Sequence, residues 1–199
     1  MKLNNNDNLY IANQKYISLA IEKILSGDII IYPTDTLYSF GADATNSDAI
    51  YKINKIKGRK SPLSIILKNL NDIHDYAKIE ENTLMKINTI LPGPYTILLE
   101  SKNNPKLSSH IQCESKLIGI RIIDNKFCNS IIHKINRPIV TTSVNVHGQN
   151  SLVNINDIKN QFHGITTFYS KKRLISNGST IIDFSITPES IIRKGAGKY

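Results

Sequence analysis

One stretch of the chain, residues 28–59, sets the strongest limits on the fold. An apolar run at residues 28–32 follows a glycine and is typical of a strand that is buried on both faces. Pro33 has no N–H to donate to a neighbouring strand, so we expect the strand to end there. The short polar residues 34–36 come next, and open α/β sheets bind ligands just beyond the carboxyl ends of their strands. The stretch therefore predicts a buried strand that leads into a ligand site.

A helix is predicted after this polar turn. Isoleucines recur at positions 50, 53 and 56, and residues 46–48 offer candidate N-caps. The helix should end at Lys57, Gly58 and Arg59, where two cations flank a glycine. A helix end with two cations suits an anionic ligand. It is equally typical of a glycine C-cap with basic residues that complement the helix dipole. The sequence lacks both GxxxxGK[ST] and a GxGxxG after a strand, so these residues alone leave both interpretations open.

The remaining pattern predicts the fold class. Strands alternate with helices in the first half of the chain and cluster near its end, which favours a twisted, open, mixed α/β sheet flanked by helices. We expect one domain over residues 1–199, with residues 1–15 as a loosely ordered lead-in. Further strands are predicted at 63–67, 96–100, 117–123, 138–143, 165–169, 180–184 and 190–193, and further helices at 17–25, 71–77, 81–91, 127–135 and 156–162.

Composition narrows the class of partner and compartment. The net charge of +9 and pI near 9.5 favour anionic partners such as nucleotides or RNA, although a nucleotide bias in the genome would also enrich Asn, Ile and Lys. Two cysteines, Cys113 and Cys128, form no C-x-x-C pair, and the five histidines show no metal-binding spacing. No apolar run approaches the roughly 20 residues of a membrane span, and the polar N-terminus lacks a signal-peptide core. We therefore expect a cytoplasmic protein without a membrane partner and without a metal site of its own.

Two later segments carry candidate functional residues. Arg121 stands among isoleucines in a predicted interior strand, where a buried charge requires an anionic partner; a snorkelling position at the strand edge is the alternative. Ser143 and Asn145 follow another predicted strand, and they could equally be ordinary turn residues.

The chain carries a series of short motifs in the same order as one family, and it therefore resembles the YrdC/Sua5 threonylcarbamoyl-AMP synthases. The resemblance covers about residues 17–196 and matches the short, single-domain form. Its motifs here are PTDTLYSFG at 33–41, KGR at 57–59, PL at 62–63, PGPYT at 92–96, GIR at 119–121, SVN at 143–145, STIID at 179–183 and IIRKGA at 191–196.

The resemblance implies a YrdC-like fold and a nucleotidyl transfer. L-Threonine, bicarbonate and ATP, accompanied by Mg²⁺, would give threonylcarbamoyl-AMP and pyrophosphate. Partner proteins would then use the product for the t6A modification at position 37 of tRNA. Whether tRNA contacts this subunit is left open.

The resemblance also assigns roles to residues. The K-x-R and S-x-N pairs make Lys57, Arg59, Ser143 and Asn145 the catalytic candidates. A closed cationic pocket would protect the unstable threonine carbamate and neutralise charge on the phosphates. The implied ATP-binding residues are Lys57, Arg59, Asn145 and Arg193, and the implied threonine-binding residues are Thr36, Arg121, Ser143 and Ser179. Asp35 could coordinate magnesium, although a Thr-Asp-Thr turn explains an aspartate at this position equally well.

Several positions depart from the usual family pattern. Ser39 replaces a common glycine, and Lys60 replaces a proline in a link that is about two residues short. Ile66 stands where many members carry a histidine that helps bind threonine. Ile122 and Val144 replace a frequent proline and alanine. These changes affect the threonine pocket and the loop after residue 59 most.

Two other functions compete with the enzyme. One is an RNA-binding or ribosome-assembly module that kept the fold and its basic surface. The other is a nucleotide-binding paralogue without threonine activity, which the change at Ile66 favours. The K-x-R and S-x-N pairs favour the enzyme, because an RNA-binding module has no need of both at one pocket.

Overall fold

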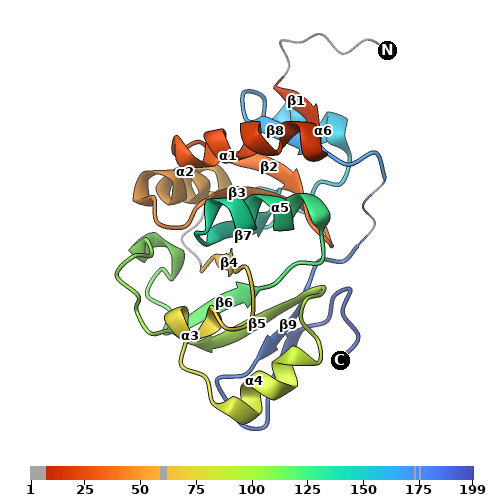
Figure 1. Ribbon diagram of the computed structural model, residues 1–199. Coiled ribbons are helices and arrows are strands. Elements are labelled where there is room, and N and C mark those ends of the chain that lie inside the picture. Colours follow the sequence, from red (N-terminus) through yellow and green to blue (C-terminus); the bar gives the residue numbers. More distant parts are fainter. Residues whose placement is uncertain (1–7, 59–61, 173, 175) are drawn as a thin grey trace.

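The fold centres on a twisted mixed sheet, seen in a computed structural model that describes residues 8–58, 62–172, 174 and 176–199 (Figure 1). Within those ranges the sheet has ten strands in the order β1-β8-β2-β3-β7-β4-β6-β5-β9-β10. Four neighbouring pairs are parallel and five are antiparallel, which confirms the predicted mixed α/β sheet. The strands are β1 (Leu9–Ile11), β2 (Ile30–Pro33), β3 (Tyr38–Asp43), β4 (Ser64–Ile66), β5 (Tyr95–Glu100), β6 (Leu117–Arg121), β7 (Ile139–Ser143), β8 (Thr166–Tyr169), β9 (Thr180–Asp183) and β10 (Ser190–Arg193).

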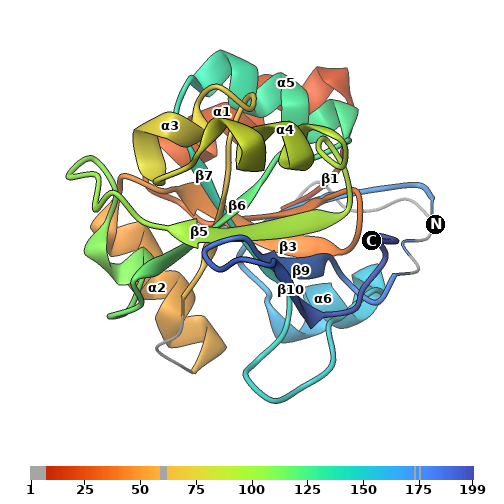
Figure 2. The same ribbon diagram turned by 90° about the horizontal axis from the view of Figure 1, so that it is seen from below.

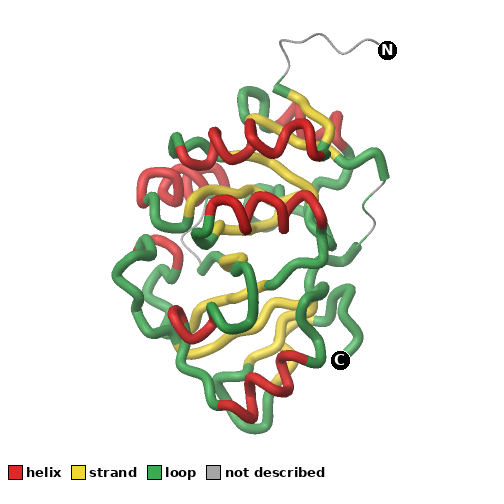
Figure 3. The backbone as a smooth tube through the Cα atoms, viewed as in Figure 1, coloured by secondary structure: helices red, strands yellow, loops and turns green. Residues whose placement is uncertain are grey.

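Helices cover both faces of this sheet. Helices α1, α3, α4 and α5 lie on one side, and α2 and α6 lie on the other (Figure 2). Figure 3 separates them by colour from the strands and the loops. No helix of the described residues is long and apolar enough to cross a membrane. The helices are α1 (Ile17–Leu25), α2 (Ser47–Lys57), α3 (Ile73–Tyr76), α4 (Glu81–Asn88), α5 (Lys126–Ile135) and α6 (Ile155–Gln161), with two 3₁₀ turns at η1 (Gln14–Tyr16) and η2 (Ser109–Ile111).

Local sequence signals set the ends of the two longest helices. The Asn46 side chain accepts a hydrogen bond from the Ala49 N–H at the start of α2, and Gly58 ends that helix in the left-handed conformation with φ 65°. At α5, the Asn125 side chain caps two backbone N–H groups, and Asn136 adopts φ 52° at the other end. The predicted glycine stop after residue 57 is confirmed.

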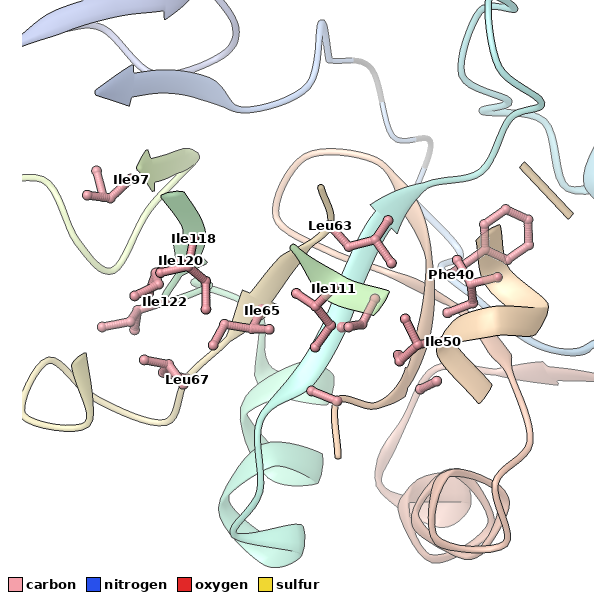
Figure 4. Packing of buried hydrophobic residues seen from close by; sticks show 14 of the residues in the cluster. Phe40, Ile50, Leu63, Ile65, Leu67, Ile97, Ile111, Ile118, Ile120 and Ile122 are labelled. Carbon is pink, nitrogen blue, oxygen red and sulfur yellow. The ribbon is translucent and has the colours of Figure 1, made fainter. Parts of the chain in front are cut away.

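Apolar side chains form two clusters. The smaller one packs α1 and α5 against the sheet and includes Ile17, Ile131 and Phe168. The larger one runs through the sheet and its other helices, and Figure 4 shows Phe40 and Ile50 at one end of it and Ile118 and Ile120 at the other. Together they hold the central strands rigid beneath the site.

Several predictions need correction. Residues 9–11 of the expected lead-in are a strand that pairs with β8, so the described part of that segment is ordered in the sheet. The expected loop between β2 and α2 contains β3, which pairs antiparallel with β2. Helix α4 ends at Asn88 rather than residue 91, and α6 runs from Ile155 to Gln161 rather than over 156–162. The helix expected at 71–77 covers only Ile73–Tyr76.

Candidate active site

A pocket of about 200 Å³ lies on the sheet, where small polar side chains replace core residues. Strand pairing explains how they meet. Ser39 of β3 lies opposite Ser143 of β7, and Ser64 of β4 lies opposite Thr141 of β7. Because side chains alternate between the two faces of a strand, these four hydroxyl groups share one face. All four residues line the pocket.

Gly119 of β6 leaves room for this floor. It lies opposite Ser64, and a Cβ at position 119 would come within 2.6 Å of the Ser64 Oγ. The position also faces Thr96 of β5, whose methyl group would lie 3.4 Å from that Cβ. A glycine in this strand interior therefore allows the two flanking strands, β4 and β5, to bring Ser64 and Thr96 close to it.

Arg121 lines the pocket and is held by the protein itself. Its Nη2 donates a hydrogen bond to Asp35 Oδ1 at 2.6 Å, and its Nε donates to the Tyr95 carbonyl oxygen at 3.1 Å. The side chains of Arg121 and Asp35 are only 6% and 7% exposed. The sequence argument assigned the anionic partner of Arg121 to a ligand, and that inference was incomplete because Asp35 supplies a carboxylate. The bond gives Asp35 Oδ1 a cationic partner within the protein, whereas the buried Oδ2 has no hydrogen-bond partner among the described residues.

The turn between β2 and β3 places Asp35 and Thr36. The Thr34 hydroxyl oxygen accepts hydrogen bonds from the N–H groups of Thr36 and Leu37 and donates one to the Leu37 carbonyl. The Asn125 side chain donates to the Thr34 carbonyl from the start of α5. This turn presents Thr36 to the pocket and lets Asp35 reach Arg121 behind it.

Arg193, from the edge strand β10, also lines the pocket. Its guanidinium donates to the Ser179 carbonyl through both Nε and Nη2, at 3.2 and 2.8 Å, and Nη2 also lies 3.2 Å from the Ser179 Oγ. The Ser179 hydroxyl forms a second bond of 2.8 Å with the buried Thr96 hydroxyl. Burial, and then the neighbouring charge of Arg121, lower the pKa of Arg193. The guanidinium groups of Arg121 and Arg193 therefore lie at the same pocket.

Lys57 lies behind this pocket, at the end of α2. It is 1% exposed, and its Nζ donates to three oxygens: the Ser143 carbonyl at 2.7 Å, the Asn145 carbonyl at 3.1 Å and Asn145 Oδ1 at 2.8 Å. The Asn145 amide also accepts from the Ser143 hydroxyl and donates to the carbonyls of Val146 and Gln149. Lys57 and Asn145 thus fix the segment that carries Ser143.

The structure brings most of the predicted site together. Lys57 and Asn145 adjoin the pocket through Ser143. Arg59 lies outside the described residues. Five of the predicted residues line the pocket, namely Thr36, Arg121, Ser143, Ser179 and Arg193.

Other lining residues were missed from the sequence, among them Ser39, Ser64, Thr96 and Thr141. Their signal was a hydroxyl or glycine at alternate positions of interior strands, where an apolar side chain is the normal occupant. Tyr38, in the same strand as Ser39, is 3% exposed in the core, and its hydroxyl accepts from the Ser170 N–H at 3.1 Å.

A larger open groove of about 740 Å³ lies elsewhere, beside α3 and the end of α5. Its walls mix Lys68 and Arg137 with Asp72 and Asp75. Such alternating charges do not converge on one ligand group. The smaller pocket, with two guanidiniums and a hydroxyl floor, is the stronger candidate for chemistry.

Comparisons with known proteins show which family the chain is similar to. Residues 22–195 match the family described as Sua5_yciO_yrdC, telomere recombination. A putative threonylcarbamoyl-AMP synthase of Methanocaldococcus jannaschii is 36% identical over 149 residues, which cover 73% of this chain and 68% of that protein. The threonylcarbamoyl-AMP synthase of Bos taurus is 27% identical over 187 residues, covering 88% of this chain and 66% of that one.

One solved structure is similar along most of the chain. P. abyssi Sua5 complexed with L-threonine superposes with a TM-score of 0.83 at 26% identity, over 92% of this chain and 55% of that one. This chain therefore spans about half to two thirds of the length of these relatives. With the match over residues 22–195, the chain belongs to the Sua5/YciO/YrdC family.

Proposed function

We propose that this protein is a threonylcarbamoyl-AMP synthase, which forms threonylcarbamoyl-AMP and pyrophosphate from L-threonine, bicarbonate and ATP. One observation carries the proposal: Arg121 and Arg193 meet at a pocket whose other walls include the hydroxyl groups of Thr36, Ser143 and Ser179. Guanidinium groups bind carboxylates and phosphates, and short hydroxyls bind an amino acid's polar groups. Two relatives carry this activity in their names, and a similar solved protein binds L-threonine.

The proposed roles combine the family resemblance with the lining of the pocket. Arg121 binds the threonine carboxylate, and Thr36, Ser143 and Ser179 bind its remaining polar groups. Arg193, which also lines the pocket, binds the nucleotide phosphates. For Arg59, which lies outside the described residues, the family resemblance alone implies a second phosphate contact. Asn145 contacts the nucleotide from beyond Ser143, and Lys57 holds both in place.

The reaction balances without a protein nucleophile. The threonine amine and bicarbonate form a carbamate and release water. A carbamate oxygen then attacks the α-phosphorus of ATP, and the bond to the leaving pyrophosphate breaks. Cationic side chains neutralise the charge that develops on the leaving group, and a pocket that excludes water protects the carbamate from decomposition.

Magnesium enters this proposal as part of the nucleotide substrate. Among the described residues, no three His, Cys, Asp or Glu side chains lie together as a metal site. Asp35, the acidic group at the pocket, already accepts from Arg121. Mg²⁺ commonly binds substrate phosphates and water with few protein ligands. The product would serve t6A modification of tRNA at position 37, through partner proteins in the cytoplasm.

Pyrophosphate release tests the proposal. We expect the purified protein to release pyrophosphate from ATP only when L-threonine and bicarbonate are both present. Arg193→Gln should lower kcat/KM by about 100-fold, since one charged contact to a transition state contributes about 3 kcal/mol. Arg137→Gln, which removes an arginine far from the pocket, should change it less than twofold. Release that is indifferent to threonine would contradict the proposal, and RNA affinity without turnover would favour a binding module.

A further inference from the structure

Asp35 and Arg121 form the most buried ion pair among the described residues. Arg121 belongs to β6, an interior strand between β4 and β5, and Asp35 belongs to the β2–β3 turn. They are 86 residues apart in the sequence. A buried guanidinium without a partner is costly, so Asp35 is needed for Arg121 to remain inside the fold.

The contacts of Arg121 are divided between protein and pocket. The Tyr95 carbonyl engages Nε and Asp35 engages Nη2, whereas Nη1 has no partner among the residues that the structure describes. Two contacts at different nitrogens fix both the position and the plane of the guanidinium. Because Arg121 lines the pocket, the unengaged nitrogen is available to a ligand carboxylate there.

Asp35 is itself held in place. The hydrogen bonds of Thr34 to residues 36 and 37 close the turn, and Asn125 ties that turn to α5. Burial raises the pKa of Asp35, and the Arg121 charge opposes that rise. The Arg121 charge therefore favours the ionised form of the carboxylate, and the carboxylate in turn offsets the cost of burying the guanidinium.

We propose that Asp35 is a positioning residue for the amino acid substrate: it orients Arg121 so that Nη1 receives the substrate carboxylate beside Thr36 and Ser179. This inference rests on the proposed function. Asp35 does not touch the substrate. Its loss should raise the KM for threonine far more than the KM for ATP, because the phosphates bind at the Arg193 wall.

The test compares steady-state pyrophosphate release by the wild type, Asp35→Asn and Asp35→Glu. L-Threonine is varied at saturating ATP and bicarbonate, and ATP is then varied at saturating threonine. We expect Asp35→Asn to raise the threonine KM at least about tenfold and the ATP KM less than twofold, since a small misplacement of an orienting group can cost about 100-fold in rate. Asp35→Glu, which keeps the charge but moves the carboxylate, should raise the threonine KM by a smaller factor.

Asp43 offers a matched control. Its side chain is 5% exposed and pairs with Arg137 at 3.0 Å, but it lies outside the pocket. Asp43→Asn should lower the thermal unfolding midpoint while both KM values stay within twofold of the wild type. A general loss of packing would affect the threonine KM and the ATP KM alike, so it would not raise the threonine KM alone.

The outcomes are distinct. A wild type that releases pyrophosphate only with threonine, together with an unchanged threonine KM in both Asp35 variants, would overturn the inference and leave the proposed function standing. Equal rises in both KM values would also overturn it. If Asp35→Asn does not fold, the Asp35→Glu variant decides by the same criterion. A wild type without threonine-dependent release would overturn the proposed function and this role of Asp35 with it.

Discussion

Gly41 offers a sharp test of how the site is built into the sheet. Tyr32 of β2 extends its ring across β3 at Gly41, and the ring is 2% exposed. A Cβ at position 41 would lie 3.1 Å from Tyr32 Cδ1 and 3.3 Å from Cζ, and closer still to Cε1. Ordinary contacts between carbon atoms are about 3.5–4.0 Å. The ring therefore occupies the space that any side chain at position 41 needs.

The cost of Gly41→Ala follows from that overlap. Inserting a methyl group into a packed core costs about 1–3 kcal/mol. Replacing glycine restricts the unfolded chain, which offsets about 0.4–1 kcal/mol of that cost. We expect a net loss of about 1–2 kcal/mol in the free energy of unfolding. For a domain of this size, that loss lowers the thermal midpoint by roughly 2–8 °C.

The assay is urea unfolding of four proteins: wild type, Gly41→Ala, Tyr32→Leu and the double variant. Tyr32→Leu is itself destabilising, but it removes the ring from the space above residue 41. In that background the alanine should be neutral or stabilising, which gives a coupling free energy of about 1–3 kcal/mol. An equal cost of Gly41→Ala in both backgrounds would refute the reasoning, because the ring would then not be the obstacle.

Two further predictions concern buried and surface charges. Lys57→Met removes a charged donor from three oxygens of the Ser143–Asn145 segment, of which Asn145 Oδ1 keeps its bond from the Ser143 hydroxyl. We expect the free energy of unfolding to fall by about 3 kcal/mol. Lys55→Met, on the exposed side of the same helix, should change it by less than about 0.5 kcal/mol, and equal effects would contradict the assigned contacts. A hydrogen bond from Tyr199, and then the charge-assisted bond from Lys86, lower the pKa of Glu189 from 4.5 to about 2. Its contribution to stability should be complete above pH 4.5 and lost between pH 4.5 and about 2. The difference in unfolding midpoint between wild type and Glu189→Gln should shrink across that window, and a constant difference would argue against the pairing.

Local patterns in the sequence predicted the helices and most strands, but β3 shows where such patterns fail. Tyr38, Phe40 and Ala42 alternate along it with Ser39, Gly41 and Asp43, which is the period of a strand, but the small and polar residues also favour a loop. Ser39 faces the pocket and Gly41 faces the Tyr32 ring, so neither position carries an apolar side chain for the core. A strand with a ligand site on one face shows its apolar side chains on the other face only, and the polar turn before it hides that weaker pattern.

The contacts between side chains of the site are a second feature that the sequence did not predict. Residue types and family resemblance identified Lys57, Arg121 and Asn145, but they did not reveal their partners. Lys57 reaches the Ser143 carbonyl across 86 residues, and Arg121 reaches Asp35 across the same separation. Such pairs depend on strand order, which sequence periodicity does not specify.

The two arginines of the pocket differ in a way that sets the direction of a bound ligand. Arg121 has a carboxylate partner, whereas Arg193 has only the carbonyl and hydroxyl oxygens of Ser179 among the described residues. Burial and the Arg121 charge both lower the pKa of Arg193, so an anion bound beside Arg193 favours its charged form. The Arg193 wall therefore gains more from a multiply charged group than the neutralised Arg121 end does. This asymmetry favours phosphates at Arg193 and a single carboxylate at Arg121, and the reverse orientation would leave the unneutralised guanidinium facing the smaller charge.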